Sequence, residues 1–554
     1  MNDIQEIIKK ELKKIGIETA DHLEHPKDLE HGDYSFFIKD AAIDPKKLPL
    51  EKIKHEYIEK VVLVGKFINF YLSPKFFKDS VQAILNNPTR FGANESLAGE
   101  KIIVEYTDPN PFKEFHIGHL MSNAVGESLS RIIQWSGAEV KRACYQGDVG
   151  PHVAKAIWAM KRLSEEMPLE ENPLARKVEF LGKAYVYGAR SYEEDENFKK
   201  EIDLINKVVY EKTDPEINKL YDWGRRVSLD HLDEIYKKLG TKFDYFFFES
   251  ETAPIGMFIV EEYLAKGIFV KSEGAVIFKG EDYGLHTRVF VTSQGLPTYE
   301  TKELGLAKMK FDREDFEKSI VITANEQSDY FKVLLKALEF VNPTAANKTR
   351  HISHGMMRFA DGKMSSRKGN VITGESMIAD VETLVQEKIK DRDMNPAQKK
   401  EVAEVVAVAA IKYSILKQSP GRDIIFDFEK SLSFEGDSGP YLQYAYARAR
   451  SVLEKADKEG IEPAAGIFAE NSHLEKILYR FPEIVEKARK EFAPQNITIY
   501  LTQLASAFNN YYANNQIVSA EDKNSSQKVA LTSTFASVME NGLTLLGIKA
   551  PMKM

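Results

Sequence analysis

The spacing of apolar and polar residues divides the chain into segments with different periods. The first 90 residues begin with an amphipathic helical pattern and continue with strand-like runs such as KVVLVGKFINFYLS. Residues 86–100, NNPTRFGANESLAGE, are rich in Asn, Gly and Pro, which is typical of a linker. We therefore predict a small α+β unit over residues 1–90.

A strand–helix–strand pattern follows this linker. The run IIVEY predicts a buried strand, HLMSNAVGESLSRIIQWSG predicts a helix that ends before Gly137, and EVKRACYQGD predicts a second strand. This order favours an α/β fold with a parallel sheet. Residues 155–280 or so are mostly helical and charged, and we interpret them as an insertion that splits the α/β domain. Strand-like patterning then resumes at RVFVTSQ and SIVITANEQ.

From about residue 375 onward the pattern is nearly all helical. The segment ITIYLTQLASAFNNYYANN repeats apolar residues at helical spacing, which predicts a helix with one buried face. That face comprises Ile497, Leu501, Leu504, Ala505, Phe508 and Tyr512.

The composition of the 554 residues narrows the class of protein. Hydrophobic residues make up 43% and charged residues 29%, as in ordinary globular proteins, and no apolar run approaches the length of a membrane span. The single cysteine, Cys144, excludes an intramolecular disulfide framework and a Cys-based zinc cluster. Because the N-terminal helix also lacks a secretory apolar region, we expect a cytoplasmic protein. The net charge of −8 does not indicate nucleic acid binding, although a local basic face can act within an acidic protein.

The segment FKEFHIGHL lies where the first strand of the α/β unit turns into its helix. A helix N-terminus presents free N–H groups, so it is suited to binding an anion. Gly118 allows close approach of a ligand, His116 and His119 can donate hydrogen bonds to phosphate oxygens, and Lys113 adds positive charge. Two histidines that only cap the helix are the alternative interpretation.

The segment DGKMSSRKGN places three cations among glycines and serines. Flexible backbone, hydroxyl groups and the charges of Lys363, Arg367 and Lys368 suit a clamp for a polyphosphate. An exposed basic loop without a ligand is equally consistent with this segment alone.

Together, the two motifs resemble those of a class I aminoacyl-tRNA synthetase, in which they hold ATP and stabilise the leaving pyrophosphate. Ser366 stands where that family's KMSKS pattern has its second lysine. Arginyl-tRNA synthetases often show this departure, and in them a lysine just before the HIGH motif is thought to compensate. Lys113 occupies that place.

The resemblance to arginyl-tRNA synthetases covers nearly the whole chain, through YQGDVG, GLPTYETKELGLA, ANEQSDYF, HGMMRFADGKMSSRKGNV and GKFINFYL. It implies a Rossmann-like parallel-sheet catalytic domain with a helical insertion, a small α+β N-terminal domain and an all-α C-terminal domain. The expected divisions are a tRNA-binding module over 1–90, the catalytic domain over 100–375 with its insertion at about 155–280, a helical stem over 376–436, and an anticodon-binding domain over 437–554.

The resemblance also assigns an amino-acid pocket. A guanidinium is planar, positively charged and carries five donors, so its pocket needs carboxylates and carbonyls. Tyr299 and Glu303 lie four residues apart, on one face of a predicted helix, and Glu105 ends the first strand, where it can receive the substrate ammonium. Family members usually have Asp at the position of Glu303. The implied arginine-binding residues are Glu105, Asn110, Tyr299, Glu303 and Gln327.

The implied reaction activates L-arginine with ATP and Mg²⁺ to arginyl-adenylate and transfers arginine to the 3′ end of tRNA(Arg), releasing AMP and pyrophosphate. No side chain is assigned to a metal, and we expect a monomer that does not bind a membrane. The implied catalytic residues are Lys113, His116, His119, Lys363 and Lys368. The implied ATP-binding residues are His116, Gly118, His119, Met357, Lys363, Ser365 and Ser366.

Contacts with tRNA can be predicted only coarsely. Single-stranded bases stack on aromatic side chains, so Tyr444 and Tyr511 in the helical C-terminal region are candidates for contacts with the anticodon. Most aromatic residues of that region are nevertheless expected in its core. Asn69 and Tyr71 are candidates for contacts with the tRNA elbow, because the N-terminal module has that role in the family.

Two other functions remain open from the sequence. A class I lysyl enzyme would also need an acidic pocket. A catalytically silent tRNA-binding relative is the alternative from another class, and the departures at Ser366 and Glu303 leave it open. The single cysteine argues against a cysteinyl enzyme, the chain is too short for the editing insertion of leucyl, isoleucyl and valyl enzymes, and a single-domain nucleotidyltransferase would not need the C-terminal helices.

Overall fold

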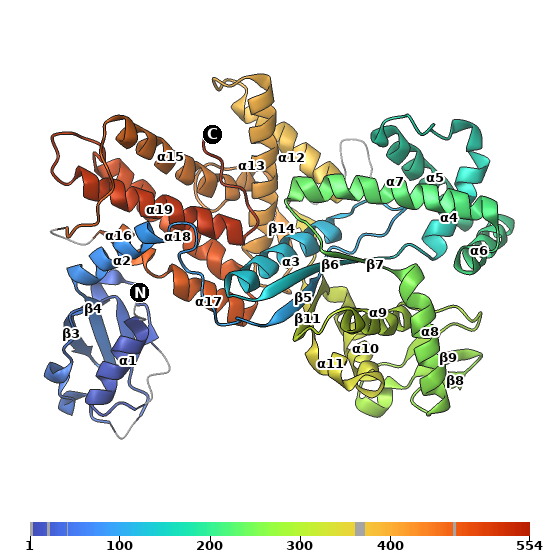
Figure 1. Ribbon diagram of the computed structural model, residues 1–554, viewed down its shortest axis with the longest axis horizontal. Coiled ribbons are helices and arrows are strands. Elements are labelled where there is room, and N and C mark those ends of the chain that lie inside the picture. The colour runs from blue at the N-terminus through green and yellow to red at the C-terminus, as the bar shows by residue number, and fades with distance from the viewer. Residues whose placement is uncertain (1–3, 19–22, 41–42, 361–371, 469–471) are drawn as a thin grey trace.

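The chain was analysed as a computed structural model, which describes residues 4–18, 23–40, 43–360, 372–468 and 472–554. Figure 1 shows the N-terminal unit at one end of the molecule and the helices of the insertion at the other. The parallel sheet lies between them, beside the C-terminal helices. None of the helices in the described part of the chain is long and apolar enough to cross a membrane.

The N-terminal unit is an antiparallel sheet in the order β1-β2-β4-β3, packed against one helix. Its core contains Ile8 and Leu12 from the helix and Tyr34, Ile68 and Phe70 from the strands. Its elements are α1 (Ile4–Lys14), β1 (Leu23–Glu24), β2 (Tyr34–Phe37), β3 (Ile58–Val64) and β4 (Phe67–Leu72), and α2 (Pro74–Asn86) follows.

The central sheet has five parallel strands in the order β12-β11-β5-β6-β7. Its strands are β5 (Lys101–Glu105), β6 (Glu139–Gln146), β7 (Tyr245–Phe248), β11 (Lys318–Ala324) and β12 (Thr349–His354). Helix α3 (Ile117–Trp135) connects β5 to β6, and α10 (Ser328–Val341) and α11 (Pro343–Lys348) connect β11 to β12. Because the chain leaves β5 toward β6 on one side and returns as β11 on the other, the strand order reverses beside β5. Ligands of such sheets bind at that point, outside the carboxyl ends of the strands. The predicted parallel α/β sheet is confirmed.

The structure corrects the predicted end of the insertion. Its helices are α4 (Pro151–Arg162), α5 (Leu174–Glu194), α6 (Glu196–Glu211) and α7 (Pro215–Leu239). The next strand, β7, pairs with β6 in the central sheet, so residues up to about 280 do not form one inserted block. A four-residue apolar run carries no signal of which sheet it joins, which explains the error.

A second, antiparallel sheet follows in the order β10-β9-β8. The segment RVFV forms β10 of this small sheet, rather than resuming the parallel one. The elements are α8 (Glu249–Ala265), β8 (Val270–Ser272), β9 (Ala275–Phe278), β10 (Arg288–Val291) and α9 (Tyr299–Arg313). Helices α8 and α9 pack on each other beside the carboxyl end of β7.

The remaining described residues are mainly helical, as predicted. A short parallel pair, β13 (Met357–Phe359) and β14 (Ile424–Phe426), joins them to the central sheet. The predicted apolar face of α18 is buried except at Tyr512, which is 42% exposed near the end of the helix. The helices are α12 (Gly374–Ile389), α13 (Pro396–Leu416), α14 (Phe428–Ser431), α15 (Gly439–Lys458), α16 (His473–Leu478), α17 (Phe481–Glu491), α18 (Gln495–Asn514) and α19 (Ser525–Leu545).

A buried polar junction connects three parts of the molecule. The Lys412 ammonium on α13 is fully buried and donates to the carbonyl of Leu239, at the end of α7, and to that of Gly547, just after α19. Arg131 on α3 donates to the carbonyls of Thr544 and Gly240 at the same two helix ends. Helix C-termini carry partial negative charge, so these two cations fix the insertion and the C-terminal helices to α3.

We expect a K412M variant to lose about 2–4 kcal/mol of unfolding free energy, because two buried carbonyl groups would lose their donor. Thermal or denaturant unfolding measures this loss. The matched control is K417M on the C-cap of α13, where Lys417 lies 3.6 Å from Asp437 and remains partly exposed. Equal stability of the two variants would show that the junction does not hold the domains together.

Candidate active site

The turn between β5 and α3 has an unusual backbone. Thr107, Asp108 and Phe112 adopt positive φ angles of 81°, 47° and 66°, which side chains other than glycine rarely adopt. Hydrogen bonds hold the strained residues: the Ser122 hydroxyl accepts from the amide of Thr107, and the Asp108 carboxylate accepts from the amide of Tyr145. Such strain is found at functional sites, so the turn marks a candidate site.

The HIGH motif begins α3, as predicted. His116 is the N-cap residue, and its amide donates to Nδ1 of His119 at 3.2 Å. The two rings are stacked with their centroids 3.5 Å apart. Burial, and then the charge of Lys113, lower the pKa of His116; burial, the neighbouring His116 and Lys113 lower the pKa of His119 further. Both rings are therefore neutral at pH 7, and because Nδ1 of His119 accepts, its Nε2 carries the proton and can donate.

The basic segment DGKMSSRKGN lies outside the described residues, and so do Lys363, Ser365, Ser366 and Lys368. The residues that follow it are described, and they return to the HIGH motif. Thr373 forms an antiparallel bridge with His116, and the amide of Gly374 donates to the carbonyl of Phe115 at 2.8 Å. On its other side the segment follows β13, where Met357 is half-buried against the main hydrophobic core. The described residues that follow the second motif therefore lie at the start of the first.

An acidic floor lies at the carboxyl end of β5. Glu105 is 2% exposed, and its carboxylate lies 2.5 Å from the ammonium of Lys310, which is also buried. The charges of Glu105 and Lys310 both act on the carboxyl group of Glu303, which lies on α9. Burial, and then the negative charge of Glu105, raise the pKa of Glu303 to about 8.

A second buried ion pair, which the sequence analysis missed, lies beside this floor. Glu249 at the start of α8 accepts from the ammonium of Lys302 on α9 at 2.6 Å, and both are about 95% buried within the fold. The Lys302 ammonium also lies 5.0 Å from the ring centre of Tyr299. An acid at the carboxyl end of a parallel strand is the signal that can reveal such a residue, but the strand before Glu249 was not assigned to the central sheet.

The three remaining residues of the predicted arginine pocket, Asn110, Tyr299 and Gln327, differ in their exposure. The Asn110 side chain accepts from the amide of Gly147 at 3.2 Å, and a Cβ at Gly147 would lie only 2.5 Å from that oxygen. Tyr299 is 61% exposed at the first turn of α9. Gln327 is exposed in the short turn after β11. Glu105, Asn110 and Glu303 are thus buried or partly buried, whereas Tyr299 and Gln327 are exposed.

The segment GDVG has a structural role on the insertion side. Asp148 is fully buried and accepts hydrogen bonds from Tyr221 and Arg225 of α7 and from Ser250 of α8. The ring of His152 bonds to the carbonyl of Gly147 at 2.9 Å. These contacts hold the insertion against residues 147–150. The hydrogen bond of His152 gives that side chain a structural role.

The electrostatics of the pocket favour a cation. The buried lysines Lys302 and Lys310 each face a glutamate, at 2.6 and 2.5 Å. Glu303 and Asp108 are not members of these two ion pairs. Burial, and then the negative charge of Glu105, raise the pKa of both carboxyl groups. A guanidinium entering the pocket would relieve that repulsion by supplying positive charge and donors. In the described part of the chain, no cluster of three or more His, Cys, Asp or Glu residues could hold a metal ion.

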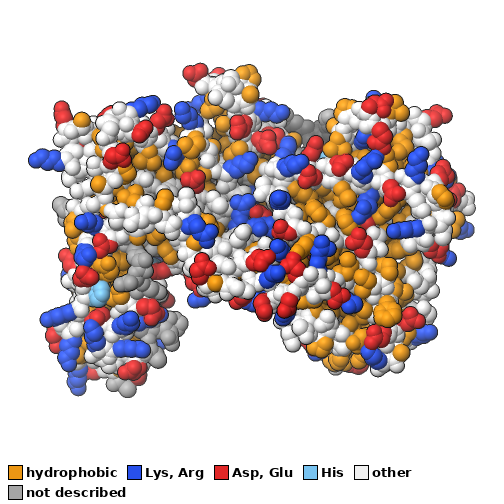
Figure 2. All heavy atoms as spheres, viewed as in Figure 1, with side chains coloured by type: hydrophobic (Ala, Val, Ile, Leu, Met, Phe, Trp, Pro, Cys, Tyr) orange, Lys and Arg blue, Asp and Glu red, His pale blue; other side chains and the backbone are white. Residues whose placement is uncertain are grey.

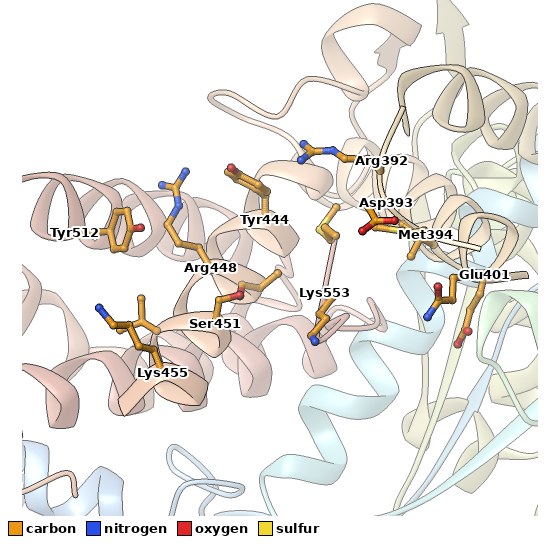
Figure 3. A pocket seen from close by; sticks show the side chains of 15 residues that line it. Arg392, Asp393, Met394, Glu401, Tyr444, Arg448, Ser451, Lys455, Tyr512 and Lys553 are labelled. Carbon is orange, nitrogen blue, oxygen red and sulfur yellow. The ribbon is translucent and has the colours of Figure 1, made fainter. Parts of the chain in front are cut away.

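A separate cavity of about 830 Å³ lies among the C-terminal helices. Figure 3 shows Tyr444 and Arg448 on α15 and Tyr512 on α18 on one side, with Arg392, Asp393 and Met394 from the α12–α13 connection on the other. The Arg448 guanidinium lies 4.8 and 5.1 Å from the ring centres of Tyr444 and Tyr512. By contrast, the hydroxyl of the predicted Tyr511 is buried, and its ring packs against the helical core.

The two candidate residues of the N-terminal unit lie on β4. Asn69 is buried, accepts from the Ser35 hydroxyl at 2.7 Å, and lines a surface cavity of about 770 Å³. Lys27 and Lys39 line the same cavity. The Tyr71 hydroxyl instead donates to the carbonyl of Glu30. Figure 2 shows Lys and Arg side chains gathered along the outer edge of this unit.

Comparisons with known proteins agree with this geometry. Residues 80–428 match the family model for the catalytic domain of class I (R) tRNA synthetases, which includes both motifs and the acidic pocket. The chain belongs to the arginyl family of class I tRNA synthetases. Residues 442–554 match the DALR anticodon binding domain, which contains most of the residues that line the cavity beside α15 and α18.

Whole-chain relatives support membership of the arginyl family. The chain is 30% identical over 562 residues to an arginine–tRNA ligase of Halothermothrix orenii, covering 99% of this chain and 98% of the relative. It is 32% identical over 548 residues to one of Clostridium perfringens, covering 96% of each. The structure of Thermus thermophilus arginyl-tRNA synthetase has the same fold, with a TM-score of 0.77, 23% identity and coverage of 100% and 99% of the two chains. The predicted family and fold class are confirmed.

Proposed function

We propose that the protein is an arginine–tRNA ligase that activates L-arginine with ATP and transfers it to the 3′ end of tRNA(Arg). The observation that carries this proposal is the group of Glu105, Asn110 and Glu303 beside the HIGH turn, to which Thr373, after the second motif, is bridged. A polyphosphate site next to an anionic pocket suits a cationic amino acid that must react with ATP.

The first step joins the arginine carboxylate to the α-phosphate of ATP and breaks the bond to the leaving pyrophosphate. Positioning and charge stabilisation, rather than a nucleophilic side chain, drive such a reaction. His116 and His119 donate N–H groups to the phosphates at the N-terminus of α3, and Lys113 supplies charge from the preceding turn. We further propose that Lys363 and Lys368 reach the same phosphates, with Ser365, Ser366, Gly118 and Met357 around the nucleotide.

Mg²⁺ neutralises charge on the phosphates of ATP when it is bound. Mg²⁺ commonly binds through substrate phosphates and water rather than through a protein cage, which fits a site whose described residues offer no carboxylate cluster for a metal. Inside the amino-acid pocket, Glu303 binds the guanidinium, while Glu105 and Asn110 bind the polar end of the substrate. Tyr299 and Gln327 close the entrance.

The second step transfers the arginyl group from the adenylate to the terminal ribose of tRNA and releases AMP. We propose that the cavity with Tyr444, Arg448 and Tyr512 binds anticodon bases, because its rings and guanidinium groups suit stacking on single-stranded RNA. Tyr511 packs against the helical core and would support the residues that line this cavity. The N-terminal unit, with Asn69 and Tyr71 and with Lys and Arg side chains along its outer edge, would bind the tRNA elbow.

The domain assignment follows from the same reasoning. We propose an N-terminal tRNA-binding module over 1–90, a catalytic domain over 100–375, a helical stem over 376–436 and an anticodon-binding domain over 437–554. We also propose that the enzyme works as a monomer in the cytoplasm, where its substrates ATP and tRNA are present.

Charging of tRNA tests the proposed function. Purified protein, ATP and Mg²⁺ are incubated with labelled arginine or labelled lysine, and with a tRNA(Arg) or a tRNA(Lys) transcript. We expect acid-precipitable arginine only with tRNA(Arg). Charging of tRNA(Lys) with lysine would support the lysyl alternative, and binding of tRNA without any charging would support a silent relative.

Arginine binding should depend on pH through Glu303. Its raised pKa means that the carboxyl group is largely protonated below about pH 8, whereas the guanidinium requires the carboxylate. The KM for arginine should therefore fall by up to about tenfold per unit as pH rises from 6 to 8, and level off above that range. Initial-rate measurements at several pH values, with the KM for ATP as the internal reference, check this. A constant arginine KM across the range would contradict the assignment.

A further inference from the structure

Lys310 lies in the last turns of α9, deep below the amino-acid pocket. It is 3% exposed, although lysine is seldom buried without a partner. Residues 299, 303, 306 and 310 recur at helical spacing, so Lys310 shares one face of α9 with Tyr299 and Glu303. That face is directed at the carboxyl end of β5, because Lys310 pairs with Glu105 there.

Lys310 and Glu105 form a close buried ion pair. The Lys310 ammonium lies 2.5 Å from Oε2 of Glu105, at an angle outside hydrogen-bond geometry. The attraction between the two groups is therefore mainly electrostatic.

The charged and titratable groups around Lys310 and Glu303 come from several elements. Lys310 pairs with Glu105 on β5, and its charge lowers the pKa of Asp108, in the turn after β5, and of Glu303 on α9. Glu249 and Glu300 add to the burial and the Glu105 charge that raise the pKa of Glu303; Lys302 already faces Glu249, and Arg288 on β10 lies 3.5 Å from Glu300. β6 and α10 contribute the hydroxyls of Tyr145 and Tyr330, whose pKa values burial raises most.

Lys310 opposes the charges that accumulate in this space. Burial and then the charge of Glu105 raise the pKa values of Asp108 and Glu303, and the charge of Lys310 lowers both. Without that ammonium, the three carboxylates would repel one another more strongly and hold protons to higher pH. A protonated Glu303 is a poor partner for a guanidinium.

We propose that Lys310 is a positioning residue for arginine, whose buried ammonium holds Glu105 at the floor of the pocket and offsets the repulsion between the neighbouring carboxylates. This role rests on the proposed function, because it concerns the same pocket. Lys310 acts through Glu105 and Glu303 rather than on the reacting atoms. The buried ammonium of Lys310 thus prepares the pocket for the positively charged guanidinium of arginine.

The alternative is an ion pair that serves the fold alone. Replacing one partner of a buried pair often destabilises a protein, so a loss of stability cannot distinguish the two roles. The pH dependence of the KM for arginine can distinguish the two roles, because a purely structural ion pair would not set the pH at which Glu303 ionises. The KM for ATP gives a second distinction, since Lys310 pairs with Glu105 and not with His116 or His119 in the described structure.

The test compares K310M, K310Q and K310R with the unaltered enzyme in ATP–pyrophosphate exchange with tRNA present. For K310M and K310Q we expect the KM for arginine at pH 7 to rise about ten- to hundredfold, with kcat at saturating arginine and the KM for ATP within about threefold. The fall of arginine KM with pH should move to higher pH by about one unit. K310R keeps the charge and should restore both properties to within about threefold. K308M is the matched control, because Lys308 is exposed on α9 and pairs with Asp312.

An unchanged arginine KM and pH profile in folded K310M or K310Q would overturn the proposal, and so would a K310R variant that fails to restore them. If K310M does not fold, K310Q, which keeps a polar donor, provides the same measurement. Failure of the unaltered enzyme to exchange with arginine would instead refute the proposed function, so the two failures are distinguishable.

Discussion

Above about pH 8, where Glu303 is ionised, the E303Q variant will need about a hundred- to a thousandfold more arginine for half-maximal exchange, while its kcat and its KM for ATP change little. Glu303 is the carboxylate on α9 whose negative charge is not already opposed by a close lysine, and burial surrounds it with groups of the same sign. Glutamine keeps the size and one acceptor but removes the charge. Loss of one partner of a buried hydrogen-bonded charge pair typically costs 2–5 kcal/mol, which corresponds to this range.

The matched control for this prediction is D312N. Asp312 lies on the same helix but is exposed and pairs with Lys308, so the control removes an acid without touching the pocket. We expect its arginine KM to stay within about twofold of the unaltered value, as for most surface substitutions. If E303Q behaved like D312N, the guanidinium would bind elsewhere.

The second large effect is expected for H116N, which should lower kcat for arginine activation about a hundred- to a thousandfold. Loss of one preorganised donor to a developing charge usually costs about 3–4 kcal/mol of transition-state stabilisation. Asparagine is among the best N-cap residues, so this variant keeps the cap of α3 while removing the imidazole. Unfolding temperature should therefore remain within a few degrees, as measured in the same preparation.

A control for H116N is H286N, which removes an exposed histidine outside the turn. That variant should retain full exchange activity. A stable H116N protein with near-normal kcat would mean that the ring only caps the helix, which is the interpretation that the isolated motif also allows.

The sequence predicts those parts of the site that depend on local structure. A buried strand, a turn and a helix N-terminus occur in order over a short stretch, so the anion-binding position of His116 and His119 follows from local rules. Tyr299 and Glu303 share a helix face for the same reason. The resemblance adds Glu105 and Asn110, which the structure places on the same side of the sheet as Glu303.

Contacts between distant segments are less accessible to such reasoning. Lys310 and Lys302 look like ordinary basic residues of a surface helix, and only the packing of α9 against β5 and α8 reveals their buried partners. The sequence of the short strand β7 does not indicate which sheet the strand joins. Glu249, which follows this strand, therefore could not be assigned to the pocket. Helical spacing likewise could not show that Tyr511 packs inward whereas Tyr512 is exposed beside Arg448.

ATP–pyrophosphate exchange with arginine, citrulline and lysine, each with tRNA present, tests most directly whether a triphosphate site adjoins an anionic pocket for guanidinium. Citrulline has nearly the shape of arginine but no charge, so it leaves the buried carboxylates without a cation. We predict exchange with arginine and at least a thousandfold lower kcat/KM with citrulline and with lysine. Comparable exchange with either of the other two amino acids would contradict the account.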